Sequence, residues 1–226
     1  EKKYPLLMFQ YSGPGSQQVS NRWGDYRTLW HKDLANKGYI IACVDGRGTG
    51  FKGSKFKKST YLNLVKYESI DQISVARTLG ELPFIDKKRI GIWGWSFGGH
   101  MAAHCLLTGG GVFSFAIAVA PVTNWRFYDT IYTERFMRTP QENPEGYDLN
   151  SPLNYADQLK GNFLIIHGSG DDNVHVQNTM RMVDALIQAD KQFDWMIYPD
   201  KNHSISGGNT QKHLYTKMTN FIFKNL

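Results

Sequence analysis

Residues 94–98 read Gly-Trp-Ser-Phe-Gly and fit the G-x-S-x-G pattern of a nucleophilic serine. An apolar, strand-like run over 89–93 precedes the pattern, and a helix-like run follows it from about Gly99. A sharp strand-to-helix turn needs glycine two positions on each side of the serine, and it lifts the hydroxyl above the sheet edge. It also turns the next N–H toward the same space. This context predicts a nucleophile at Ser96 rather than a serine in an ordinary glycine-rich turn.

A serine hydroxyl is a weak nucleophile unless a base takes its proton and an acid orients that base. In this kind of sheet the acid and then the histidine follow the serine along the chain, each at the carboxyl end of a strand. The run over 163–167 is followed by Asp171 and Asp172, and the run over 193–198 by His203. Order and spacing therefore predict His203 as the base and one of the two aspartates as the acid.

Other motifs carry weaker signals. His167 directly precedes a glycine turn and is predicted to be a packed strand-end residue. His100 and His104 lie one helical turn apart, but no Glu-x-x-His pattern or cysteine accompanies them, so we predict no metal. Residues 48–53 fit G-x-G-x-x-G after a strand, yet no helical apolar pattern follows, so we predict no nucleotide cofactor.

The elements that must position these residues alternate along the chain. Strand-like runs lie at 6–11, 39–44, 89–93, 113–120, 163–167 and 193–198. Helix-like runs lie at 26–37, 70–82, 99–107, within 123–136, and at 176–189 and 210–223, whereas 45–69 is predicted to be mostly loop. Apolar strands that alternate with helices indicate a mainly parallel sheet with helices on both faces. We therefore predict one α/β domain over residues 1–226.

The composition excludes several classes of protein. The chain has 226 residues, 41% hydrophobic and 20% charged, which is typical of a globular domain. Its longest apolar stretch, 112–122, is too short to cross a membrane. The net charge of +6 comes from dispersed lysines without a nucleic-acid-binding motif, so we predict no nucleic-acid partner. Cys43 and Cys105 lie in apolar runs and are predicted to be buried free thiols.

Several motifs, taken in order, resemble the catalytic domain of the dipeptidyl peptidase IV branch of the prolyl oligopeptidase family of serine peptidases. One of them is the serine turn at 94–98, called the elbow below. The others are Tyr-Ser-Gly-Pro at 11–14, Asp-Gly-Arg-Gly-Thr-Gly at 45–50, Tyr-Thr-Glu-Arg at 132–135 and His-Gly-Ser-Gly-Asp-Asp-Asn-Val-His at 167–175. The resemblance covers nearly the whole chain. It implies an α/β-hydrolase fold and a cofactor-free exopeptidase that releases Xaa-Pro or Xaa-Ala dipeptides from peptide amino termini through an acyl-enzyme.

The resemblance also implies roles for individual residues. Ser96 is similar to the nucleophile, His203 to the base, and Asp171 rather than Asp172 to the acid. The Tyr11 hydroxyl and the Phe97 N–H correspond to the oxyanion hole. The expected substrate-binding residues are Val122, Trp125, Tyr128, Tyr132 and Val174, around the proline or alanine side chain, and Asn173, at the carbonyl of the preceding residue. Without the resemblance, Tyr128 and Tyr132 fit equally well the core face of a helix.

Some features depart from the family or extend beyond this chain. Relatives often have tyrosine at position 97, and an acidic residue and glycine around the position of His203, where this chain has Asn202 and Ser204. The chain begins without Met, so we expect a fragment that lacks an upstream β-propeller domain. We also expect a homodimer through the helix that ends at 221–223, and a periplasmic or extracellular bacterial protein.

Three alternatives stay open at this point. A tripeptidyl aminopeptidase or an acyl-peptide hydrolase or esterase could use the same elbow, acid and histidine. A non-catalytic scaffold is the least favoured alternative, because Ser96, Asp171 and His203 are all present.

Overall fold

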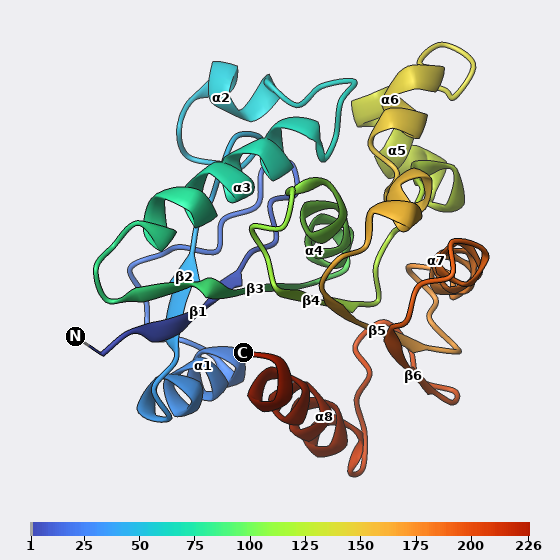
Figure 1. The fold of residues 1–226 in the computed structure, drawn as a ribbon. Helices are drawn as coiled ribbons and strands as arrows, with labels where there is room; N and C mark the ends of the chain where they lie inside the picture. The colour runs from blue at the N-terminus through green and yellow to red at the C-terminus, as the bar shows by residue number, and fades with distance from the viewer. Residues whose placement is uncertain (1) are drawn as a thin grey trace.

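Six strands form a parallel sheet in the order β2-β1-β3-β4-β5-β6 (Figure 1). The structure is a computed structural model that describes residues 2–226. The strands are β1 (Tyr4–Phe9), β2 (Ile40–Cys43), β3 (Ile85–Trp95), β4 (Phe115–Val119), β5 (Asn162–Gly168) and β6 (Asp194–Tyr198). The predicted α/β class and parallel sheet are confirmed.

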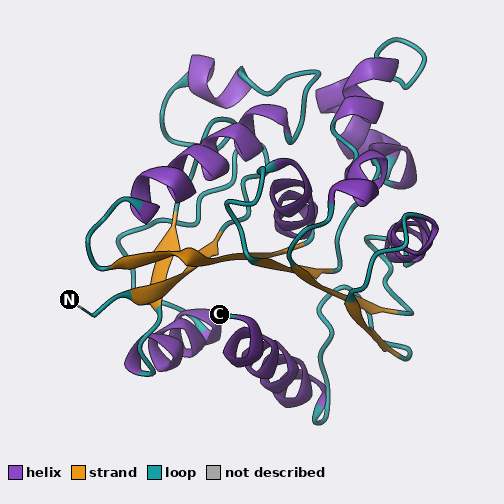
Figure 2. Cartoon of the chain, viewed as in Figure 1, coloured by secondary structure: helices purple, strands orange, loops and turns teal. Residues whose placement is uncertain are grey.

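Helices cover both faces of this sheet (Figure 2). They are α1 (Tyr26–Asn36), α2 (Ser54–Lys58), α3 (Lys66–Gly80), α4 (Phe97–Thr108), α5 (Thr130–Met137), α6 (Pro144–Leu149), α7 (Gln177–Gln188) and α8 (Thr210–Asn225), with short 3-10 turns at Trp125–Phe127 and Pro152–Gln158. Helices α1 and α8 lie together on one face, and the other helices lie on the opposite side (Figure 1). Strand β4 shows why: Phe115 and Ile117 pack toward α8, whereas Ala116 and Ala118 join the core beneath α4.

The segment 45–69 is mostly loop, as predicted, and it also contains the short helix α2 and the first turn of α3. The structure corrects two other predicted elements. The helical segment expected within 123–136 is divided near Asp129, whose carboxylate accepts a hydrogen bond from the Tyr132 amide and so begins a new helix. Helix α4 begins at Phe97 instead of Gly99, directly after the elbow serine.

The C-terminal helix also differs from the prediction. Phe221 and Ile222 were expected to be exposed for dimerisation, but both are buried against the sheet within the chain. Phe223 is 45% exposed and stacks on Tyr39, with 5.7 Å between ring centroids. The apolar end of α8 therefore completes the core of its own domain.

The strand order places several loops at one edge of the sheet. Strand β1 pairs with β2 on one side and with β3 on the other. The chain adds β2 on one side of β1 and all later strands on the opposite side, so the order of strands reverses between β1 and β3. In open parallel sheets, this reversal opens a crevice at the carboxyl ends of the strands. Phe9 pairs with Trp93, so Tyr11 and Ser96 follow their strands at the same edge. The loops after β5 and β6, which carry Asp171 and His203, reach that edge as well.

The structure also bears on the predictions about membrane spans and cysteines. Within residues 2–226, none of the helices has the length and apolarity needed to cross a bilayer. Cys43 and Cys105 are both free, and Cys105 is buried as predicted. Cys43 is only partly buried, which corrects the prediction for that residue.

Glu68, in the first turn of α3, is a fully buried carboxyl group. Neither of its oxygens has a hydrogen-bond partner in the described part of the chain. Burial raises the pKa of Glu68 to about 8. The group is therefore neutral in the folded protein at neutral pH, whereas it ionises near 4.5 when unfolded.

This raised pKa makes folding depend on pH. As pH rises from 4.5 toward 8, the unfolded chain releases the Glu68 proton and the folded chain keeps it, so stability falls over that window. We expect Glu68→Gln to raise the Tm by about 5 °C at pH 8 and by less than about 2 °C at pH 4.5. Calorimetry of the full-length protein measures this difference. Glu81→Gln, at the exposed end of α3, is the matched control, and parallel Tm curves for wild type and Glu68→Gln would contradict the prediction.

Candidate active site

Ser96 occupies the sharp turn between β3 and α4. Its backbone has φ 61° and ψ −118°, in a region that residues other than glycine rarely adopt. The Ser96 amide donates to the Val119 carbonyl at 2.8 Å, so β4 holds this strained residue in place. Strain retained in this way is common at residues that perform chemistry.

The elbow glycines are required by close backbone approach. A Cβ on Gly94 would lie 2.3 Å from the Gly98 carbonyl oxygen. A Cβ on Gly98 would lie 2.5 Å from the Gln10 carbonyl oxygen, in the loop after β1. Both distances are too short for real carbon–oxygen contacts, so the turn admits only glycine at these two positions.

Asp171 is the aspartate that the structure brings to His203. His203 Nδ1 lies 2.7 Å from Asp171 Oδ2, and the Asp171 side chain is fully buried. The other oxygen, Oδ1, accepts hydrogen bonds from the amides of Asn173 and Val174, each at 2.9 Å. Asp172 is exposed. The turn after β5 thus points one carboxylate inward and leaves its neighbour in solvent.

His167 is a second partner of this carboxylate, which the sequence analysis treated only as a packed residue. It is fully buried, and its Nε2 lies 3.1 Å from Asp171 Oδ2 and 2.8 Å from the Val174 carbonyl. Because both neighbours are acceptors, Nε2 carries the proton, and Nδ1 accepts from the Thr179 hydroxyl at 2.7 Å. His167 is packed as predicted, and it also orients Asp171.

These contacts decide the charge of Asp171. Burial acts to raise its pKa, but hydrogen bonds from His167, His203 and the Asn173 amide outweigh burial, so the pKa lies well below its usual value. An ionised Asp171 next to Nδ1 places the His203 proton on that nitrogen. The other ring nitrogen, Nε2, is then free to accept a proton.

Ser96 and His203 line one cavity of about 640 Å³. Tyr11, Tyr128 and Asn173 line the same cavity. Within residues 2–226, no hydrogen bond joins Ser96 to His203. In enzymes without substrate this contact is often long and shortens in the complex, so a shared cavity is the relevant observation.

The two residues predicted to bind an oxyanion, Tyr11 and Phe97, both lie next to Ser96. The Phe97 N–H is the first of α4, and such groups have no acceptor within the helix. Tyr11 follows β1, and its ring lies 6.0 Å from that of Phe97. Burial raises the pKa of Tyr11, with a smaller opposing effect of the Ser96 side chain beside it. The phenol therefore keeps its proton and can donate it in a hydrogen bond.

The predicted pocket residues form a cluster beside Ser96. Trp125 is buried and lies 6.0 Å from the rings of both Tyr128 and Tyr132. Val122 and Val174 are buried in the same core cluster. Of the six predicted residues, Tyr128 and Asn173 line the cavity itself. The other four do not line it and belong to the adjoining hydrophobic core.

Tyr128 also orients Asn173. The Tyr128 hydroxyl donates to Asn173 Oδ1 at 3.0 Å. Because the amide oxygen is occupied, the NH₂ group of Asn173 remains to donate to a carbonyl in the cavity.

Several lining residues were missed by the sequence analysis. Trp95 follows directly from the elbow motif, and its Nε1 donates to the His203 carbonyl at 3.0 Å. The remaining side of the cavity is lined by Tyr26, Arg27, Ser204, Ser206, Gln211 and Tyr215. These residues come from the start of α1, the loop after β6 and the start of α8, and no local pattern marks them.

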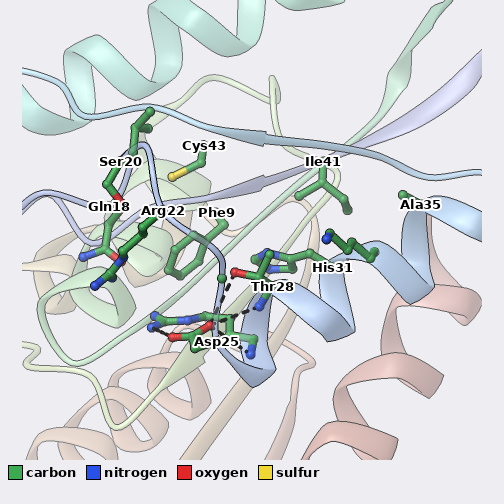
Figure 3. A pocket seen from close by; sticks show the side chains of 14 residues that line it. Phe9, Gln18, Ser20, Arg22, Asp25, Thr28, His31, Ala35, Ile41 and Cys43 are labelled. Carbon is green, nitrogen blue, oxygen red and sulfur yellow. Dashed lines mark hydrogen bonds and ion pairs between the residues drawn. The ribbon is translucent and has the colours of Figure 1, made fainter.

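Figure 3 shows a second cavity, of about 430 Å³, beside the start of α1. Its acidic residue, Asp25, accepts hydrogen bonds from the amides of Arg27 and Thr28. Burial raises the pKa of Cys43 to about 12, and burial with the charge of Arg27 lowers the pKa of His31 to about 4. A protonated thiol and a neutral imidazole do not form an activated nucleophile, so the reactive groups gather in the Ser96 cavity.

The glycine-rich motif at 48–53 and the His100–His104 pair make contacts within the protein. Gly48 O accepts from the Gly15 amide and the Gly50 amide donates to Ser16 O, so the glycine-rich turn binds the loop after β1 through its backbone. His100 Nε2 lies 2.9 Å from the Asn150 carbonyl, within the core. Within the described residues, no group of three or more His, Cys, Asp or Glu side chains could hold a metal.

Comparison with known proteins finds relatives that are similar over nearly the whole chain. A family model described as "Prolyl oligopeptidase family" matches residues 26–226. A curated fungal relative from Coccidioides posadasii, named "Probable dipeptidyl-aminopeptidase B", is 47% identical over 227 residues, 98% of this chain. The "Prolyl endopeptidase FAP" of Mus musculus is 46% identical over 225 residues, again 98% of this chain.

A solved structure is similar over the whole chain. The crystal structure of Porphyromonas gingivalis dipeptidyl peptidase 4 is 57% identical and superposes with a TM-score of 0.97, covering 100% of this chain. This chain spans 24% of the fungal relative, 29% of the mouse relative and 32% of the Porphyromonas chain. The similarity therefore concerns one part of each of these longer proteins.

Proposed function

Since this chain belongs to the prolyl oligopeptidase family of serine peptidases and has an α/β-hydrolase fold, we propose that it holds the catalytic centre of a dipeptidyl peptidase. The proposed reaction releases a dipeptide from the amino terminus of a peptide whose second residue is proline or alanine. The observation that carries the proposal is the 2.7 Å contact between Asp171 and His203 beside the cavity that contains Ser96.

In the proposed acylation step, the Ser96 oxygen attacks the carbonyl carbon of the substrate's second residue while His203 Nε2 accepts the serine proton. Asp171 stabilises the imidazolium that forms. The C–N bond then breaks, and His203 gives the proton to the leaving amine. The dipeptide remains attached to Ser96 as an ester.

Deacylation repeats the same steps with water. His203 takes a proton from a water molecule, the hydroxide attacks the ester carbon, and the Ser96 oxygen leaves with the proton from His203. In both steps the carbonyl oxygen becomes an oxyanion that accepts from the Tyr11 hydroxyl and the Phe97 N–H. Removal of one such donor typically lowers kcat by about 10²–10³.

The aromatic cluster supports the proposed preference for proline. A proline ring is rigid and apolar, so a wall such as Tyr128 gains contact area at a small cost in conformational entropy. The free NH₂ of Asn173 is suited to the carbonyl of the first residue. In this proposal a further domain, the expected β-propeller, supplies acidic groups for the substrate's free amino terminus.

A substrate panel on the full-length protein tests the proposal. We expect kcat/KM for Gly-Pro-p-nitroanilide to exceed that for Ala-Ala-Pro-p-nitroanilide and for p-nitrophenyl acetate by about tenfold or more. Faster turnover of the tripeptide substrate would indicate a tripeptidyl aminopeptidase, and faster turnover of the ester an esterase or acyl-peptide hydrolase. A fluorophosphonate is expected to label Ser96, and an unlabelled folded protein would indicate a non-catalytic scaffold.

A homodimer is a separate part of the proposal. Strand β6 forms one edge of the sheet, and its Trp195 is 44% exposed. A groove lined by Asp194, Met196, His213 and Lys217 separates β6 from α8. Because Phe221 and Ile222 are buried, the edge of β6 and not the end of α8 is the surface on which we place the second copy. Export to the periplasm or the cell exterior likewise stays a prediction.

A further inference from the structure

The loop that carries Tyr11 is anchored by three buried polar side chains. Gln10 and Ser12 flank Tyr11 in the sequence, and Gln72 projects from α3. All three are 0% exposed. Most fully buried polar side chains make hydrogen bonds, because an unpaired buried polar group is costly.

These side chains form a chain of hydrogen bonds that ends at the elbow helix. Gln72 Nε2 donates to the Val44 carbonyl at 2.9 Å and, more weakly, to Ser12 Oγ at 3.5 Å. Ser12 Oγ donates to Gln10 Oε1 at 3.2 Å, and Gln10 Nε2 donates to the Gly98 carbonyl at 2.8 Å. The chain thus connects β2, the loop after β1 and the first turn of α4.

The backbone of this loop is held just as tightly. Ser12 has φ 70°, a left-handed conformation that a serine adopts only where its surroundings enforce it. The Gln10 carbonyl and the Tyr11 Cα lie against Gly98, where a Cβ would approach them to 2.5 and 3.3 Å. The loop therefore has one conformation relative to the elbow, and Tyr11 lies between the two side chains that fix it.

We propose that Gln10, Ser12 and Gln72 are positioning residues that set the distance between the two oxyanion donors, the Tyr11 hydroxyl and the Phe97 N–H. The inference rests on the proposed function, because it assumes that Tyr11 binds the oxyanion. The Gln10–Gly98 hydrogen bond joins the residue before Tyr11 to the residue after Phe97. The network therefore connects the loop that carries Tyr11 directly to the first turn of α4, which carries Phe97.

Loss of this network is expected to affect the transition state more than substrate binding. The oxyanion forms only during the reaction, so a displaced Tyr11 hydroxyl lowers kcat and leaves KM nearly unchanged. Displacements of about 1 Å can cost up to about 100-fold in rate, and a flexible loop recovers part of that loss. We expect Gln10→Met and Ser12→Ala each to lower kcat by about tenfold, with KM within about threefold.

The test is a double-mutant cycle on the full-length protein with Gly-Pro-p-nitroanilide. Gln10→Met and Ser12→Ala are each made in wild type and in Tyr11→Phe, which lacks the donating hydroxyl. If the network acts through Tyr11, each substitution lowers kcat by less than about twofold in the Tyr11→Phe background. Ser114→Ala is the matched control. It also removes a serine hydrogen bond, to the Ile90 carbonyl, but Ser114 lies at the amino end of β4, away from the carboxyl ends that carry the site.

The possible results separate the inference from the proposed function. Equal losses of kcat in both backgrounds, or a loss confined to KM, would overturn the positioning role and leave Tyr11 as an oxyanion donor. A Tyr11→Phe variant with kcat within threefold of wild type would overturn the role of Tyr11 and the inference with it. A tenfold loss in Ser114→Ala would show a general effect of stability and would also overturn the inference.

Discussion

Alanine at Ser96 or at His203 is expected to lower kcat by about 10⁴–10⁶, and alanine at both positions is expected to lower it no further. The reason is that the two residues act as one unit. Without His203 the serine keeps its proton, and without Ser96 the histidine has no nucleophile to activate. Either single change therefore removes the whole covalent pathway, and only binding and the oxyanion donors remain.

The measurement is kcat for Gly-Pro-p-nitroanilide on the full-length single and double variants, with enzyme concentration fixed by absorbance. Ser206→Ala is the matched control, because Ser206 lines the same cavity without a role in the proposed chemistry. We expect its kcat to stay within about threefold of wild type. A loss below tenfold in Ser96→Ala or His203→Ala, or additive losses in the double variant, would remove these residues from the proposed mechanism.

The sequence predicts the reactive groups better than the site around them. The elbow at Ser96 is a short pattern in the sequence. Its glycines are required because a Cβ at either position would clash with backbone of the turn or of the adjacent loop. His203 and the aspartate pair follow from the order of strands along the chain. The choice between Asp171 and Asp172 depends on amide hydrogen bonds from Asn173 and Val174, which turn one carboxylate inward. In the sequence analysis only the family resemblance made that choice.

Residues that act through tertiary contact left no comparable signal. His167 orients Asp171 from the end of β5, but a strand-end histidine has the same local pattern when it only packs. Gln72 reaches the Tyr11 loop from α3, in a segment that the sequence predicts as a helix without indicating its neighbours. Tyr26 and Tyr215 line the cavity from opposite ends of the chain. Residues of this kind can be identified only from the folded structure, in which the strand order brings distant loops together at the carboxyl ends of the strands.

The burial of the apolar end of α8 also depends on tertiary contacts that the sequence does not show. A run of Phe221, Ile222 and Phe223 is compatible with an exposed interface or with burial under the sheet. The T-shaped contact between Phe221 and Phe115, 5.6 Å between centroids, settles this choice for Phe221. Phe115 lies on β4 in the centre of the sheet, more than a hundred residues away in the sequence.

Asp171→Asn is the second substitution with a very large expected effect, a decrease in kcat of about 10⁴. The substituted amide would keep the size of the side chain but lose the charge that stabilises the imidazolium of His203. An amide also cannot accept from His167, His203 and two backbone amides together, because one of its two polar atoms is a donor. The histidine would then adopt the wrong tautomer, with Nε2 protonated and unable to accept from Ser96.

The same substitution is expected to change how stability depends on pH. The folded pKa of Asp171 lies below its unfolded value near 3.8, so the carboxylate contributes stability above about pH 4. That contribution is lost as pH falls through the folded pKa. Asp171→Asn should therefore lower the Tm at pH 7 and lower it less at pH 3, where the unfolded wild-type chain has taken up the proton.

Asp172→Asn is the matched control for both effects, since the neighbouring carboxylate is exposed. It removes the same charge from the same turn, one residue away, so general effects of charge on the substrate or on solubility appear in both variants. A kcat for Asp172→Asn within about threefold of wild type, beside a 10⁴-fold loss for Asp171→Asn, would assign the effect to the contact with His203. Comparable losses in the two variants would show that catalysis depends on the total negative charge of this turn. The buried Asp171–His203 contact would then not be what activates Ser96.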